Sequence, residues 1–196
     1  MKHPNQLFLL AAVAAIMTGC SSPSARFYTL NSTATGDGKS QANYTVAVGP
    51  VSVPTEVDRP QFTIQVTPNR VAVDEFNRWA EPLNNNIARV VAADLATLLG
   101  TPRVAAAPLA NFKPDYRVTI EIQKFISDPG KMVRIDALWV VTRANGENLV
   151  SGHTVSGEQA TDDSHDALAA AHSRALAKVS VDIAAAIRAA VPKPAE

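Results

Sequence analysis

The chain opens with an uncharged apolar run that ends close to its only cysteine. Leu7–Met17 follows a basic residue, Lys2, and leads through two small residues to Cys20. A basic start followed by a short apolar core is typical of a secretory signal. The run is too short to cross a bilayer, because a membrane helix needs about 20 apolar residues. We therefore expect a signal peptide at residues 1–19 and a mature chain that begins at Cys20.

The end of this run, Met-Thr-Gly-Cys at residues 17–20, resembles the lipobox of bacterial lipoproteins, with Met17 where leucine is usual. The resemblance implies a diacylglyceryl thioether on the Cys20 sulfur and an acyl chain on the new amino terminus. Two or more acyl chains hold a protein stably on a membrane, whereas one holds it only marginally. The alternative is an ordinary signal peptide followed by an unmodified thiol. As the single cysteine of the chain, Cys20 has no partner for an internal disulfide.

The residue after the cysteine bears on which membrane holds the chain. In lipoprotein sorting, as the resemblance implies, an aspartate at this position retains the protein in the inner membrane. The residue here is Ser21, which predicts the inner leaflet of the outer membrane of a Gram-negative bacterium, facing the periplasm. The alternative is a source whose sorting rule differs.

The mature chain has the length and composition of one globular domain. Removing 19 of the 196 residues leaves 177, and the whole chain is 46% hydrophobic, which suits a single core. Lys plus Arg and Asp plus Glu number 18 each. Because the charges balance, there is no basic field of the kind that attracts nucleic acid. We expect no nucleic-acid partner.

The first part of the mature chain is expected to be a tether. Residues 20–43 are rich in Ser, Thr, Asn and Gly, a composition typical of a flexible linker. One apolar island interrupts it, because Phe27, Tyr28 and Leu30 fall within five residues. We expect Arg26–Leu30 to dock on the following domain as a short edge strand.

From Tyr44 onward the pattern predicts an α+β domain at residues 44–192. Alternating strand patterns occupy residues 44–53, 62–66 and 71–73, and Asp74–Pro82 breaks the alternation. A helix is predicted from Leu83 to Leu99, with Asp94 on its polar face. Three antiparallel strands follow, joined by turns at Asp128-Pro129-Gly130 and Asn145-Gly146, and a second helix covers roughly residues 163–190. We expect a mainly antiparallel sheet with two amphipathic helices packed on one face.

The sequence contains no common catalytic or metal-binding motif. The sequence has no Gly-x-Ser-x-Gly, P-loop or His-Glu-x-x-His pattern. His165 and His172 lie seven residues apart near three aspartates, a spacing that mimics a metal site, but a solvated helix start with acids matched to the dipole explains it better. We expect no enzyme activity, cofactor or metal. Trp139 fits the inward face of a strand.

Three blocks carry a second resemblance: Val46–Pro54, Val57–Gln61 and Asn77–Leu83. They resemble successive blocks of the ABC-type transport auxiliary lipoprotein family, and the Tyr28-Thr29-Leu30 island also matches. The resemblance implies an accessory subunit that works with a mammalian-cell-entry (MCE) domain protein in moving lipids between the two membranes and so maintains the envelope. It implies no catalytic residues.

The sequence is also compatible with other classes of protein and with self-association. The competing classes are an envelope hydrolase and a purely structural lipoprotein, and the chain is also a possible homo-oligomer. Within Asp58–Leu83 we predict a partner-binding surface formed by Arg59, Arg78, Trp79 and Glu81, because tryptophan and arginine are enriched at binding hot spots. The structural alternative is that Trp79 plugs the end of the sheet and Arg78 pairs with Glu81 or Asp58.

Overall fold

A five-stranded sheet runs the length of the molecule in the computed structural model, which describes residues 23–36, 38, 42–108 and 111–191. Its strands are β2 (Val46–Ser52), β5 (Val104–Ala106), β6 (Tyr116–Asp128), β7 (Met132–Arg143) and β8 (Asn148–Gln159). They lie in the order β5-β2-β6-β7-β8. β6, β7 and β8 form an antiparallel meander, whereas β2 pairs in parallel with β5 and β6. The three predicted antiparallel strands are thus confirmed.

The two hairpins of the meander follow from their turn residues. Gly130 and Gly146 have φ values of 68° and 85°, a left-handed conformation that glycine adopts without a steric penalty. The first turn sets the register Asp128↔Met132. Alternate residues of β7 then face one side and are buried: Val133, Ile135, Ala137, Trp139 and Val141. Trp139 belongs to the core, as its position in the strand predicted.

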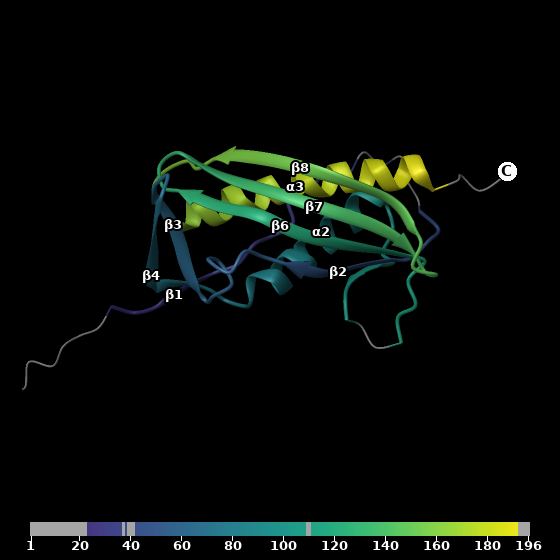
Figure 1. The fold of residues 1–196 in the computed structure, drawn as a ribbon, viewed down its shortest axis with the longest axis horizontal. Helices are drawn as coiled ribbons and strands as arrows, with labels where there is room; N and C mark the ends of the chain where they lie inside the picture. Colours follow the sequence, from purple (N-terminus) through teal and green to yellow (C-terminus); the bar gives the residue numbers. More distant parts are fainter. Residues whose placement is uncertain (1–22, 37, 39–41, 109–110, 192–196) are drawn as a thin grey trace, which may run out of the picture.

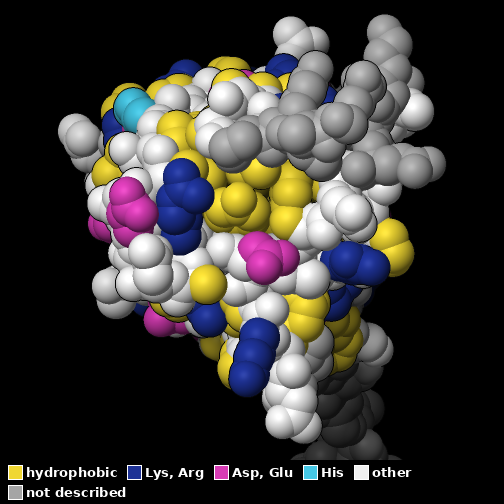
Figure 2. All heavy atoms as spheres, turned by 90° about the vertical axis from the view of Figure 1, so that its right-hand side faces the viewer, with side chains coloured by type: hydrophobic (Ala, Val, Ile, Leu, Met, Phe, Trp, Pro, Cys, Tyr) yellow, Lys and Arg dark blue, Asp and Glu magenta, His cyan; other side chains and the backbone are white. Residues whose placement is uncertain are grey.

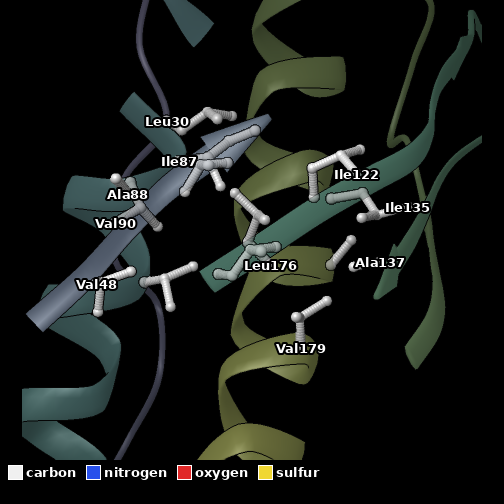
Figure 3. Packing of buried hydrophobic residues seen from close by; sticks show 14 of the residues in the cluster. Leu30, Val48, Ile87, Ala88, Val90, Ile122, Ile135, Ala137, Leu176 and Val179 are labelled. Carbon is white, nitrogen blue, oxygen red and sulfur yellow. The ribbon is translucent and has the colours of Figure 1, made fainter. Parts of the chain in front are cut away.

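Two helices, α2 (Leu83–Leu99) and α3 (His165–Ala190), cover this buried face (Figure 1). α2 packs against β2 and β5, α3 packs against β7 and β8, and the helices contact each other. Gly100 ends α2 in the left-handed region, with φ 63°. Ser164 is the N-cap of α3: its side chain accepts a hydrogen bond from the backbone N–H of Ala167. Aliphatic side chains from both helices and the sheet meet between them, as Figure 3 shows. The predicted α+β architecture is therefore confirmed.

A second, smaller sheet closes one end of the molecule. Its strands are β1 (Arg26–Tyr28), β3 (Gln61–Thr67) and β4 (Arg70–Trp79), in the order β1-β4-β3. β1 pairs in parallel with the end of β4, and no other strand among the described residues pairs with it. The apolar island thus docks as a short edge strand, as predicted.

The expectation that the strand pattern ends at Asp74 is wrong, because β4 continues to Trp79. The Asp74 carboxylate accepts hydrogen bonds from the backbone N–H groups of Phe76 and Asn77, at 3.0 and 3.1 Å. This turn within the strand shifts the register with β3 from Phe62↔Asp74 to Gln61↔Arg78. Three extra residues interrupt the alternation of inward and outward side chains. The sequence pattern therefore stops looking like a strand at a point where the strand in fact continues.

The segment after β1 also differs from the expected tether. Asp94, predicted on the polar face of its helix, is fully buried and receives four hydrogen bonds. Its Oδ1 accepts from the Ser32 hydroxyl at 2.6 Å and from the backbone N–H groups of Thr33 and Ala34 at 3.2 and 3.1 Å. Its Oδ2 accepts from the Ser180 hydroxyl at 3.0 Å. Asp94 therefore fixes residues 32–34 against the two helices.

His172 lies fully buried between α3 and the sheet. Its ring stacks on Phe125 with centroids 3.8 Å apart, and its Nε2 lies 2.8 Å from the Ser127 hydroxyl. Burial lowers the pKa of His172 from 6.5 to about 3, so the ring is neutral in the folded protein. His165 lies elsewhere, beside Asp74, and the structure does not bring the two histidines into one site.

This burial predicts that the protein loses stability in mild acid. Below pH 6.5 the unfolded chain protonates His172, whereas the folded chain resists protonation down to a pH of about 3. Stability is therefore fully present above pH 6.5 and falls by about 1.4 kcal/mol per pH unit below it. Denaturant titrations at pH 7 and pH 5 should differ by about 2 kcal/mol from this residue.

His172→Phe supplies the control for this pH effect. The variant keeps a ring against Phe125 and removes the titrating group, so its unfolding free energy should retain only a weaker pH dependence. His165 contributes to that remainder, because burial lowers its pKa while the Asp74 carboxylate partly opposes the shift. An unchanged slope in His172→Phe would show that other groups govern the acid response.

Candidate functional site

The four residues predicted to bind a partner line one hollow, beside the start of α2. Its volume is about 410 Å³. The lining side chains are Phe27, Asp58, Arg59, Pro60, Arg78, Trp79, Ala80, Glu81, Pro82 and Leu83. They come from β1, the turn before β3, the end of β4, the connection between β4 and α2, and the first residue of α2. The structure thus brings the predicted residues together and adds Phe27 to them.

Backbone hydrogen bonds hold the hollow in shape. The N–H of Trp79 donates to the carbonyl of Pro60 at 2.7 Å, and the N–H of Ala80 donates to the carbonyl of Tyr28 at 2.8 Å. These two bonds join the turn before β3, the last residues of β4 and the edge strand β1. Because the bonds involve main-chain atoms, substitution of an exposed lining side chain leaves this frame in place.

Trp79 forms the floor of the hollow and belongs mainly to the core. Only 5% of its surface is exposed. Its ring stacks on Phe62 with centroids 4.3 Å apart and meets the edge of Phe125 at 6.1 Å. A tryptophan packed in this way holds the two sheets together. The structure therefore gives Trp79 the packing role that the sequence left as an alternative.

Glu81 connects the wall of the hollow to α2. Its carboxylate accepts a hydrogen bond from the Asn86 amide at 2.8 Å and forms a close ion pair with Arg89. The Asn86 amide oxygen in turn accepts from the backbone N–H of Leu30 at 2.8 Å. Glu81 therefore fixes the positions of α2 and the N-terminal segment relative to each other.

Three of the lining side chains that reach the surface suit contact with a partner. Arg78 is partly exposed: its Nε donates a hydrogen bond to the Glu75 carbonyl at 2.8 Å, and its guanidinium lies 3.7 Å from the Glu75 carboxylate, a surface pair of little strength. Arg59 is exposed, and no ion pair involves it among the residues that the structure describes. Phe27 is 64% exposed. The exposure of Phe27 could have been predicted from the sequence, because neighbouring residues of a strand face opposite sides and Tyr28 faces the core.

Together these side chains suit recognition of another molecule. Two guanidinium groups and an exposed phenyl ring stand over an apolar floor, and arginine and aromatic side chains are enriched at protein interfaces. None of the ten lining residues is a serine, threonine, cysteine, lysine or histidine. The hollow therefore offers a contact surface of mixed polarity and no nucleophile of those types.

Behind the floor, His165 links α3 to the smaller sheet. Its Nε2 lies 3.3 Å from the Asp74 carboxylate, and its ring lies 5.0 Å from Phe62. Burial raises the pKa of Asp74, but hydrogen bonds from Asn77 and Phe76 outweigh it and lower the pKa overall. Asp74 is therefore ionised at neutral pH, and its hydrogen bonds shape β4.

Cys20 and Ser21, the predicted lipidation and sorting residues, lie outside the residues that the structure describes. The described chain resumes at residue 23, three residues before β1. Among the described residues, no helix has the length and apolar content needed to span a membrane.

The fold and the hollow define a small α+β domain that closes its own core and presents a contact surface at one end. The chain belongs to the family of ABC-type transport auxiliary lipoprotein components, whose model matches residues 28–184. That span takes in the large sheet, β3 and β4, the last residue of β1, α2, most of α3 and every lining residue except Phe27. The chain is thus a lipoprotein of transport systems of this type.

Two solved structures share this fold. The crystal structure of protein XCC0632 from Xanthomonas campestris has a TM-score of 0.69 and 19% identity, covering 82% of this chain and 93% of that one. The crystal structure of an uncharacterized protein has a TM-score of 0.69 and 18% identity, covering 84% and 99%. At these identities the likeness concerns the fold alone. No curated protein matches the chain.

Proposed function

We propose that this chain is the non-catalytic auxiliary subunit of an ABC-type system that moves lipids between the membranes of a Gram-negative envelope. The observation that carries the proposal is the family match over residues 28–184. Its partner is an MCE-domain protein, and its role is to maintain envelope integrity. The domain contributes contact surface, and the partner carries the lipid.

The anchor in this proposal is Cys20. A lipoprotein needs an acylated cysteine, and the chain has one cysteine, located where an apolar signal run ends. Cleavage before Cys20 and three acyl chains make the attachment effectively permanent, since each buried methylene contributes about 0.8 kcal/mol. Ser21 directs the anchored protein to the outer membrane.

Intact-mass measurement of the mature protein tests the anchor. We expect a chain that begins at Cys20 and carries the mass of acyl chains, and we expect Cys20→Ser to lack that mass. In density-gradient fractionation the wild type should follow the outer membrane, and Ser21→Asp should shift to the inner membrane. A free thiol on an otherwise normal mature chain would contradict lipidation, and wild type in the inner-membrane fraction would contradict the sorting.

The proposed contact for the partner is the side of the hollow formed by Arg59, its most available charged residue. Because Arg59 is exposed and forms no ion pair among the described residues, Arg59→Glu should change the unfolding free energy by no more than about 0.5 kcal/mol. If the residue is a hot spot, the loss of affinity is about 2 kcal/mol or more. That corresponds to about thirtyfold weaker capture of the MCE-domain protein.

Arg134→Glu is the matched control, because Arg134 is also exposed but lies on β7, away from the hollow. We expect this variant to capture the partner as the wild type does, measured by quantitative mass spectrometry of solubilised envelopes. Equal capture by Arg59→Glu and Arg134→Glu would remove Arg59 from the interface.

A further inference from the structure

Large hydrophobic side chains are left exposed mainly on the smaller sheet. Of the eight that are exposed among the described residues, five belong to its strands: Phe27, Val66, Val71, Val73 and Phe76. Apolar side chains gathered on one surface usually mark a contact with another molecule or with a membrane. The smaller sheet is therefore the part of the described surface where contact with another molecule or a membrane is most expected.

The strand registers place most of these side chains on one face. Phe27 pairs with Arg78, Val73 pairs with Thr63, and Val71 pairs with Gln65. Paired residues of a sheet share a face, and this face is opposite to the one that buries Tyr28, Phe62 and Trp79. Phe76 lies in the turn made by Asp74, two residues before Arg78, and is 43% exposed. We call the side chains of Phe27, Val71, Val73, Phe76 and Arg78 the outer face.

The chain that leads to the anchor enters at this sheet. Cys20 precedes Arg26, the first residue of β1, by six residues. At about 3.5 Å per residue, six residues reach no farther than about 20 Å. Arg26, where the chain enters the smaller sheet, therefore lies within about 20 Å of a lipid attached to Cys20.

The opposite end of the molecule lies beyond that reach. α3 begins beside the smaller sheet, where His165 contacts Phe62, and runs away from it for 26 residues (Figure 1). At 1.5 Å per residue its far end is about 39 Å away. Figure 2 views that far end, where hydrophobic side chains lie at the centre with charged ones around them. The short segment between Cys20 and Arg26 therefore brings the smaller sheet, and not this far end, to the membrane.

We propose that the outer face docks on the surface of the membrane that holds the lipid anchor. The two phenylalanines enter the boundary between head groups and acyl chains, and the valines beside them lose their contact with water. Arg78 places its stem on this apolar surface and its guanidinium among the head-group phosphates. The anchor and the face thus hold the domain in one orientation, with α3 directed away from the bilayer. This inference rests on the acylation of Cys20 proposed above.

Fluorescent labels on the full-length lipidated protein test the docking. Phe27→Cys and Phe76→Cys each introduce one free thiol, because an acylated Cys20 has none, and an environment-sensitive dye is attached there. The protein is reconstituted in vesicles of phosphatidylethanolamine and phosphatidylglycerol, with or without a phospholipid that carries a quencher near its head group. Val155→Cys is the matched control, because Val155 is 59% exposed and lies on β8.

Flotation of the vesicles first shows whether the protein is anchored, and quenching then shows whether it docks. We expect the labels at positions 27 and 76 to shift to the blue and to lose most of their fluorescence to the quencher lipid, and the label at 155 to keep it. Val71→Cys replaces either variant that fails to fold. Floating protein with equal quenching at all sites would overturn the docking and leave the anchor intact. A blue shift without quenching would mean that protein covers the face, which also overturns it. Protein that fails to float overturns both the anchor and the docking.

Discussion

Trp79→Ala is expected to destabilise the folded domain by about 3–5 kcal/mol, because truncation of a buried tryptophan leaves a cavity in the core. The indole is 5% exposed and packs on Phe62 and Phe125. It therefore joins the smaller sheet to the large one. Urea titration at pH 7 measures the loss, which is a large part of the 5–15 kcal/mol that stabilises a typical domain.

Phe27→Ala is the control for this prediction. Phe27 is an aromatic residue of the same sheet, but it is 64% exposed, so its truncation should cost no more than about 0.5 kcal/mol. If Trp79→Ala instead unfolds like the wild type and loses only partner capture, then Trp79 acts as a binding residue and its packing role is refuted.

Asp94→Ala is expected to cost about 3–5 kcal/mol, because it removes the acceptor of four hydrogen bonds at a fully buried position. The N–H groups of Thr33 and Ala34 would be left without this acceptor, and the segment would lose its attachment to α2. Residues 26–34 should then become accessible to proteases in the folded protein. Urea titration and limited proteolysis give the two measurements.

Asp94→Asn separates the lost bonds from the lost charge. The amide keeps one oxygen to accept from the segment at residues 32–34, and its NH₂ group can donate to the Ser180 hydroxyl. We expect a smaller loss of stability than in Asp94→Ala and continued protection from proteases. Equal stability of Asp94→Ala and the wild type would show that the N-terminal segment is not held by this carboxylate.

The sequence predicted the parts of the fold that local chemistry determines. The hairpin turns at Gly130 and Gly146 need a left-handed residue, and glycine stands there. The apolar stripe of α2 and its glycine stop predicted the helix from Leu83 to Leu99, and these are its observed bounds. Signals of this kind depend on neighbours in the chain, so a single sequence contains them.

The features that the sequence missed depend on contacts between distant residues. Asp94 is polar and was placed on the solvent side of α2, but partners about sixty and eighty-six positions away make its burial favourable. The alternation of β4 disappears at Asp74 because that carboxylate binds its own backbone. Both errors concern an aspartate whose hydrogen bonds decide the structure, and hydrophobic periodicity does not register such bonds.

The candidate site was predicted in composition but not in the roles of its members. Arg59, Arg78, Trp79 and Glu81 do line one hollow. Trp79 and Glu81 turn out to be structural, whereas Phe27 joins the surface from β1, far away in the sequence. An edge strand of three residues is too short for its sequence pattern to predict which strand it pairs with or which residues its side chains contact.

The central claim is that the folded domain, and not only its lipid anchor, engages a transport system. The direct test compares affinity-tagged wild type with a chimera that keeps residues 1–25 and replaces the rest with an unrelated domain. Both are purified from solubilised envelopes, and their partners are quantified by mass spectrometry. The account predicts that an MCE-domain protein and ABC-transporter subunits are enriched on the wild type alone. Equal amounts of these proteins on both baits would contradict it.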